Sequence, residues 1–133
     1  MKRKSVLSQI SEIKSYKNGW FENSNFQGIE VGKVFDSLSL DALADIFSIP
    51  FFDSYIPYLY PTTDNKISVE WGFFNDPDII CLEVDLTTYI GYYSSYNTYT
   101  YQAYETQINL LTELYVLCDL LKRASIQPNE YIK

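Results

Sequence analysis

Two stretches decide the fold: residues 67–73 read Ile-Ser-Val-Glu-Trp-Gly-Phe, and residues 80–86 read Ile-Cys-Leu-Glu-Val-Asp-Leu. In both, apolar side chains alternate with polar or small ones, which is the period of a strand with one buried face. The residues between them, Asn75-Asp76-Pro77-Asp78, form turns readily. The two stretches therefore predict an antiparallel hairpin.

A hairpin centred on the Asp76-Pro77 bond places the apolar side chains of both strands on one face, whereas a slip of one residue would not. The same register sets Glu70 opposite Glu83 and Asp85 opposite Ser68. Like charges that face each other destabilise a sheet. We expect this repulsion to be relieved when a cationic partner binds.

The segments on either side of the hairpin complete the fold. Apolar residues recur at helical spacing over residues 5–17, 29–47 and 106–123. The order of elements predicts an α+β fold: an antiparallel four-stranded sheet over roughly residues 55–104, with two N-terminal helices and one C-terminal helix packed on one face. Within that sheet, residues 94–97 are expected to turn.

The length and composition of the chain fit one folded unit. With 133 residues, 47% of them hydrophobic, we expect a single domain over 1–133, with loosely ordered ends at 1–4 and 125–133. No stretch is apolar enough for a membrane span, and the basic start lacks the apolar core of a signal peptide. Two cysteines without a Cys-x-x-Cys spacing fit a cytoplasmic protein that makes no membrane contact.

The charge of the chain is unevenly spread. The net charge is −7, yet residues 36–121 contain thirteen acidic residues and one basic residue, Lys66, which is a net −12 for that segment. This balance argues against direct nucleic-acid binding, which needs clustered lysine and arginine. The chain also has no histidine, the commonest general base and metal ligand. These features favour a cationic partner, and we expect no cofactor.

Acidic residues allow two further interpretations. Glu70, Glu83 and Asp85 on one sheet face could act as general acid and base in a small carbohydrate-active or hydrolytic enzyme. The acidic turn with Asp76 and Asp78 could bind a hard cation together with Asp64. Because the regular ligand pattern of a calcium loop is missing, the turn interpretation is favoured, and no metal site is expected.

Tyrosine is the most distinctive residue type of this chain. Residues 87–104 contain seven of its thirteen tyrosines, in alternation with threonine and serine that suits strands. Tyrosine offers a large contact area at low entropic cost, and arginine both stacks on its ring and pairs with carboxylates. Our candidate partner-binding residues are therefore Glu70, Glu83, Asp85, Asp76, Asp78, Tyr92, Tyr99 and Tyr101.

Several short motifs within about residues 10–90 carry a resemblance. They are Asn18-Gly19-Trp20, Pro57-x-x-Tyr60-Pro61-Thr62, Glu70-Trp71 and Leu82-Glu83-Val84-Asp85. In these motifs the chain resembles a family of small uncharacterised bacterial and phage-island proteins. The resemblance implies a cytosolic protein of a bacterium or a mobile element, and it brings no catalytic residue.

The leading hypothesis is a non-enzymatic acidic binding protein. It would neutralise a basic, nucleic-acid-handling protein, as an antitoxin, an immunity protein or a phage-encoded inhibitor of a bacterial defence system does, through a carboxylate- and tyrosine-rich sheet face. Two alternatives stay open. One is the carboxylate enzyme described above, and the other is a structural module that forms a homodimer through its tyrosines.

Overall fold

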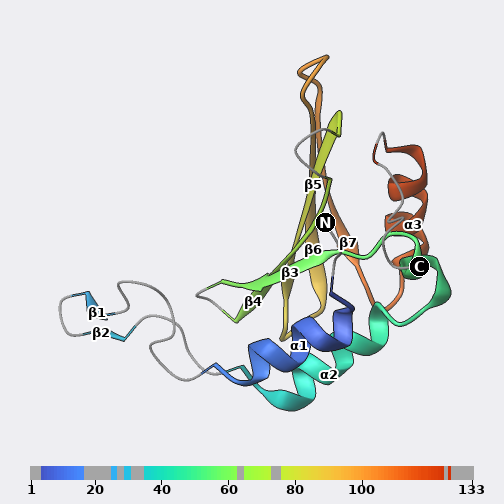
Figure 1. The fold of residues 1–133 in the computed structure, drawn as a ribbon. Coiled ribbons are helices and arrows are strands. Elements are labelled where there is room, and N and C mark those ends of the chain that lie inside the picture. Colours follow the sequence, from blue (N-terminus) through green and yellow to red (C-terminus); the bar gives the residue numbers. More distant parts are fainter. Residues whose placement is uncertain are drawn as a thin grey trace.

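The structure is a computed structural model that describes residues 4–16, 25–26, 29–30, 35–62, 65–72, 76–124 and 126. Within these residues it shows three α-helices and a five-stranded antiparallel sheet in the order β3-β4-β5-β6-β7 (Figure 1). The helices are α1 (Val6–Lys14), α2 (Ser37–Ile46) and α3 (Leu114–Arg123), with a 3-10 turn at Pro50–Asp53. The sheet strands are β3 (Tyr58–Pro61), β4 (Lys66–Trp71), β5 (Asp78–Asp85), β6 (Ile90–Asn97) and β7 (Ala103–Asn109).

The predicted α+β class and the antiparallel sheet are confirmed, but the sheet has five strands instead of four. The additional strand is β7, which pairs with β6 from Ala103 to Asn109. The helix predicted over 106–123 therefore begins only at Leu114. The turn expected at 94–97 also moves, because these residues belong to β6 and the chain reverses between Asn97 and Gln102, where the Asn97 amide donates to the Gln102 carbonyl at 2.9 Å.

The N-terminal helices are shorter than the patterns predicted. Helix α1 occupies Val6–Lys14 of the predicted 5–17, and the Ser5 hydroxyl caps it by accepting from the Ser8 amide at 3.1 Å. Helix α2 begins at Ser37 instead of residue 29, because the Asp36 carboxylate accepts from the Ser39 amide at 3.0 Å and fixes the start there. Before it, β1 (Asn25–Phe26) pairs with β2 (Ile29–Glu30).

The register of the central hairpin differs from the prediction by two residues. The observed pairs are Glu70 with Cys81, Glu83 with Ser68, and Asp85 with Lys66. The predicted pairing of Glu70 with Glu83, and of Asp85 with Ser68, is therefore wrong. Each apolar side chain still faces the core, since a shift of two residues preserves the face.

Two backbone features explain the observed register. Gly72 has a φ of +97°, and a Cβ there would lie 2.5 Å from the Asp78 carbonyl oxygen, so a glycine lets the two strands approach closely at this point. Pro77 is not the apex of the turn, because its carbonyl accepts from the Thr98 amide at 2.8 Å, beside the end of β6. The start of β5 is thereby held against β6.

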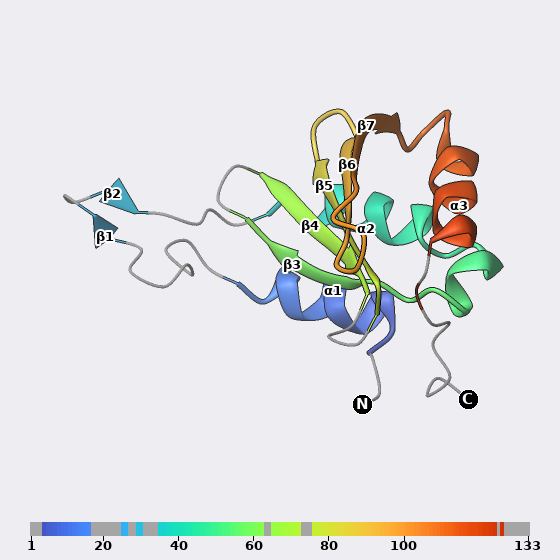
Figure 2. The same ribbon diagram turned by 90° about the horizontal axis from the view of Figure 1, so that it is seen from above.

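One core joins the helices to a single face of the sheet, which we call the inner face. The strands contribute Leu59, Ile67, Val69, Trp71, Ile80, Leu82, Val84, Tyr93 and Ile108 to this core. The helices add Ile10 and Ile13 from α1, Leu40 and Leu43 from α2, and Leu117 and Leu121 from α3. Figure 1 shows α1 and α2 side by side, with α1 against β3 and α3 next to β7. The view from above in Figure 2 also places α1 along β3.

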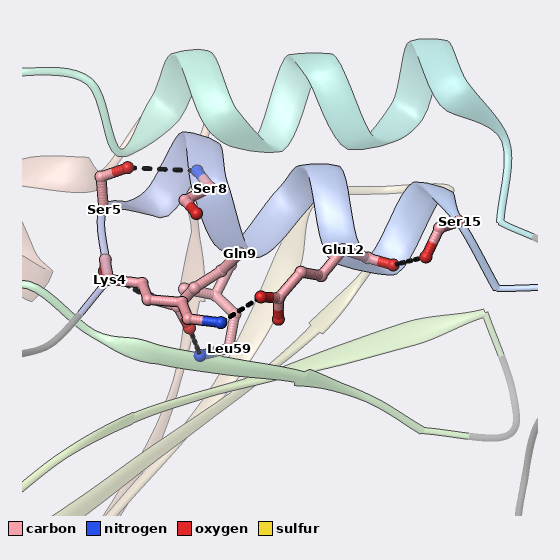
Figure 3. A network of polar contacts seen from close by, with 7 residues as sticks. All are labelled: Lys4, Ser5, Ser8, Gln9, Glu12, Ser15 and Leu59. Carbon is pink, nitrogen blue, oxygen red and sulfur yellow. Dashed lines mark hydrogen bonds and ion pairs between the residues drawn. The ribbon is translucent and has the colours of Figure 1, made fainter.

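Helix α1 is fastened to the first strand of the sheet through a buried amide (Figure 3). The Gln9 side chain is 5% exposed, and its Oε1 accepts from the Leu59 amide at 2.6 Å. Its Nε2 donates to the carbonyls of Lys4 and Pro57, both at 2.9 Å. Gln9 thus occupies the outer edge of β3.

The two ends of the chain lie mostly outside the described residues. Of the expected loose ends, residues 1–3, 125 and 127–133 lie outside the described residues, so that expectation stays a prediction. Lys4 is described, and its ammonium group forms an ion pair with Glu12. None of the helices in the described ranges combines the length and apolarity that crossing a bilayer requires.

Candidate functional site

The candidate site is the sheet face opposite the core, which we call the outer face. Strand alternation and the register place on it Tyr58, Tyr60, Lys66, Ser68, Glu70, Ile79, Cys81, Glu83, Asp85, Ile90, Tyr92, Ser94, Tyr96, Ala103, Glu105, Gln107 and Asn109. The buried apolar side chains of the three helices all belong to the inner-face core. Glu83, Tyr92, Glu105 and Gln107 are exposed, so the middle of the outer face is open.

Three predicted residues meet in one hollow of the outer face. The hollow has a volume of about 220 Å³ and is lined by Lys66, Glu83, Asp85, Thr88, Ile90, Tyr92 and Gln107. The Lys66 ammonium nitrogen lies 3.6 Å from Glu83 Oε1, and Lys66 faces Asp85 in the register. The lysine thus lies beside two carboxylates, and the hollow presents an excess of negative charge.

A hydrogen bond between tyrosine and carboxylate lies beside this hollow. The Tyr92 hydroxyl donates to Glu105 Oε2 at 2.6 Å. This bond raises the pKa of the Tyr92 hydroxyl, because the carboxylate holds the phenolic proton. The sequence pattern misses Glu105 because it lies between the predicted sheet, which ends at residue 104, and the predicted helix, which begins at residue 106. The period-two position of Glu105 along β7 is the signal that could have found it.

The other half of the outer face is formed by β3, β4 and β5. The rings of Tyr58 and Tyr60 lie with their centroids 5.7 Å apart, and Glu70 faces Tyr58 across the strands. The alternation of Tyr58 and Tyr60 in the sequence would have placed both on one face. The two tyrosines and Glu70 thus repeat here the mixture of rings and carboxylate found at the hollow.

The thiol of the outer face is kept in its protonated form. The Ser68 hydroxyl oxygen lies 3.3 Å from the Cys81 sulfur, and burial raises the pKa of the Cys81 thiol. Burial likewise raises the pKa of the Tyr60 hydroxyl. A thiol that stays protonated at neutral pH is a poor nucleophile. Burial thus disfavours the thiolate of Cys81, which is the nucleophilic form of the side chain.

The remaining predicted residues lie elsewhere. Asp76 is 5% exposed, so its carboxylate contributes little to any surface. Asp78 is half-buried and accepts from the Asn97 side-chain amide at 2.8 Å. Tyr99 and Tyr101 lie in the β6–β7 turn and are 72% and 75% exposed.

The tip of this turn is continuous with the outer face. The Tyr101 ring lies 6.5 Å from the ring of Tyr96, which is on the outer face. The structure therefore brings together Glu83, Asp85 and Tyr92, places Glu70 on the same face, and connects Tyr101 through Tyr96.

The possibility of a cation at the acidic turn has little support in the described part of the chain. There, no group of three or more cysteine, aspartate or glutamate residues is placed to hold a metal ion. Asp64, the third residue of the alternative cation site, lies outside the described residues.

The chain was also compared with known proteins. No protein-family model, no curated protein and no solved structure matches it. The resemblance in the short motifs therefore stays a prediction.

Proposed function

We propose that this protein is a non-enzymatic binding protein that neutralises a basic protein partner by covering it with the outer face. One observation carries the proposal: four carboxylates and four tyrosines share an open sheet face with a single lysine, Lys66. The carboxylates are Glu70, Glu83, Asp85 and Glu105, and the tyrosines are Tyr58, Tyr60, Tyr92 and Tyr96.

The chemistry of this face suits arginine. The guanidinium group pairs with a carboxylate through two parallel hydrogen bonds and stacks on aromatic rings. Tyr92 and Glu105 present both kinds of group at one place, since their side chains are hydrogen-bonded. Strands hold such groups at fixed spacing, so little side-chain entropy is lost on binding.

A nucleic-acid-handling protein is the partner class that fits best. Its binding groove concentrates lysine and arginine to hold phosphates. An acidic face that occupies the groove competes with the nucleic acid directly, and long-range attraction accelerates the encounter. An antitoxin, an immunity protein and a phage-encoded inhibitor would all act in this way.

The test compares three forms of the protein as affinity baits in a nuclease-treated bacterial extract. The face variant E83Q/E105Q removes two exposed carboxylates from the outer face. The control variant D45N/D53N removes two exposed carboxylates outside it, so both variants change the net charge equally. We expect the wild type and the control to capture one basic protein that the face variant does not retain.

The mode of action is then tested on the captured protein. Added wild-type protein should displace nucleic acid from it, and the face variant should not. A partner that both variants capture equally, or one that keeps its nucleic acid in the presence of the wild type, would contradict the proposal.

A further inference from the structure

The two edges of the sheet differ in the hydrogen-bond donors that they present. At the β3 edge, the amide of Leu59 donates to Gln9, and Pro61 has no amide hydrogen. The carbonyl of Pro57 also accepts from Gln9. Of the edge-facing amides of β3, none is left to pair with another strand, so this edge is closed.

The β7 edge is arranged differently. The Asn97 amide donates to the Gln102 carbonyl at 2.9 Å, and the Leu110 amide donates to the Tyr89 carbonyl at 3.0 Å. Hydrogen-bonded pairs alternate in an antiparallel ladder, so the backbone amide and carbonyl groups of the even-numbered residues of β7 point towards β6. Ala103, Glu105 and Gln107 therefore turn their backbone groups away from the sheet.

The outward backbone groups of β7 are available for hydrogen bonds to a further strand. In the described part of the chain, no hydrogen bond uses the amides of Ala103, Glu105 or Gln107, and all three residues are exposed. The Gln107 carbonyl receives one long contact of 3.4 Å from the Thr106 hydroxyl. The free edge ends at Asn109, whose outward amide donates to the Glu113 carboxylate at 3.2 Å.

We infer that β7 is a docking edge, onto which an extended, arginine-bearing segment of the basic partner adds as a sixth strand. This inference rests on the proposed function and specifies how the partner is bound. Backbone pairing to a free edge supplies affinity, and side chains at alternate positions supply specificity. Glu105 would face a side chain of the new strand on the outer face, where an arginine or lysine is complementary.

A second copy of this chain fits the edge poorly. In the two-fold register centred on Glu105, the two Glu105 carboxylates would face each other, which is unfavourable in a sheet. The net charge of −7 also opposes self-association. A cationic strand meets neither obstacle.

The test uses a synthetic peptide of seven residues, the length of β7, with alternating threonine and arginine. The matched peptide has the same sequence, but the amides along the edge that would pair with β7 carry N-methyl groups. This change keeps the charge of the peptide and blocks its backbone hydrogen bonds to β7. The variant Q107P removes one outward amide and leaves the bonds to β6 in place. Circular dichroism and amide NMR spectra verify that the variant Q107P is folded.

We expect the unmodified peptide to slow hydrogen exchange at the amides of Ala103, Glu105 and Gln107. Its affinity for Q107P should be about three- to tenfold weaker than for the wild type, since one net hydrogen bond is lost. The N-methylated peptide should bind the wild type more weakly and give no protection on β7.

The outcomes separate this inference from the proposed function. If both peptides bind the wild type and Q107P equally while E83Q/E105Q weakens binding, edge pairing is wrong and the proposed function stands. If E83Q/E105Q has no effect on binding of the arginine peptide, the edge pairing and the proposed function are both contradicted. A dimer of the free protein that Q107P dissociates would show that a second copy occupies the edge, which overturns the inference.

Discussion

At the scale of single residues, the buried side-chain amide of Gln9 affects both the attachment of α1 and the edge of the sheet. It satisfies one amide and two carbonyls that would otherwise lie unpaired between α1 and β3. A buried donor without a partner costs more than the net gain of a hydrogen bond. Gln9 therefore both fastens the helix and closes the edge of the sheet.

Replacing Gln9 with alanine should lower the free energy of unfolding by about 1–3 kcal/mol, because the buried Leu59 amide loses its acceptor. Urea denaturation measures the change. The control is S8A, an exposed position on the same helix, which should change stability by no more than about 0.5 kcal/mol. Equal effects of the two substitutions would show that Gln9 has no special role.

Tyr93 makes stability depend on pH in the alkaline range. Its side chain is 2% exposed, and burial raises the pKa of its hydroxyl from 10.0 to about 12. The folded state therefore keeps the proton where the unfolded state loses it. The stabilisation is complete below pH 10 and is lost as the pH rises towards 12.

The variant Y93F isolates this contribution, because the other tyrosines titrate in both proteins. Between pH 10 and 12, the wild type should lose on the order of 2 kcal/mol more stability than Y93F. Urea denaturation at several pH values measures the difference. Parallel curves for the two proteins would contradict the assignment.

At the scale of elements, sequence pattern predicts a strand well only where one face is buried throughout. Strands β4 and β5 alternate between apolar and polar residues over residues 67–71 and 80–85, and the pattern correctly places their carboxylates Glu70, Glu83 and Asp85 on one face. Strand β7 shows no such alternation, because Ala103, Tyr104, Glu105 and Gln107 are all exposed. Ile108 of β7 instead continues the helical spacing of α3, so the pattern predicts a helix from residue 106 and does not show that Glu105 belongs to a strand.

The register of β4 and β5 could not be predicted by the same reasoning. Registers that differ by two residues bury the same side chains. What separates them is the close approach of Gly72 to Asp78 across the hairpin and the bond from Thr98 to Pro77, and neither contact is visible in the alternation of apolar residues. Like-charge repulsion between Glu70 and Glu83 was an artefact of the wrong register.

A second glycine permits the close packing of β5 against β6. A Cβ at Gly91 would lie 2.5 Å from Cδ1 and 3.0 Å from Cγ of Leu82, whose side chain is fully buried. We expect G91A to destabilise the protein by about 1–3 kcal/mol, since Leu82 must leave its position. The measurement is urea denaturation of the single variants G91A and L82A and of the double variant.

This double-mutant cycle tests the contact itself. In the background of L82A the added methyl group enters the space left by the leucine. The double variant should therefore be more stable than the sum of the single effects by about 0.5–3 kcal/mol. Additive effects would show that Gly91 is required for another reason.

At the scale of the whole molecule, charge is the dominant property. Residues 36–121 carry a net −12, and a charge of this density lowers stability through self-repulsion. Salt screens exposed charges, so added salt should stabilise the free protein. The same salt should weaken a complex held by opposite charges. A binding protein of this kind is therefore expected to respond to salt in opposite directions when free and when bound.

The response of peptide binding to salt locates the charges that bind the partner. Binding of the threonine–arginine peptide to the wild type should weaken steeply as salt increases. In E83Q/E105Q the peptide should bind roughly fivefold more weakly at low salt and show a shallower salt dependence, because two exposed charge pairs are lost. Calorimetric titration at several salt concentrations measures both quantities.

The variant D45N/D53N decides whether the position of the charge matters, since its net charge equals that of the face variant. If only the total charge attracts the peptide, both variants weaken binding and flatten its salt dependence to the same extent. If the outer face binds the peptide, the control loses far less affinity than the face variant and keeps the steep salt dependence of the wild type. Because long-range attraction depends on both net charge and its placement, the control should slow association slightly while its dissociation rate stays unchanged. An equal loss in the two variants would remove the outer face from the mechanism.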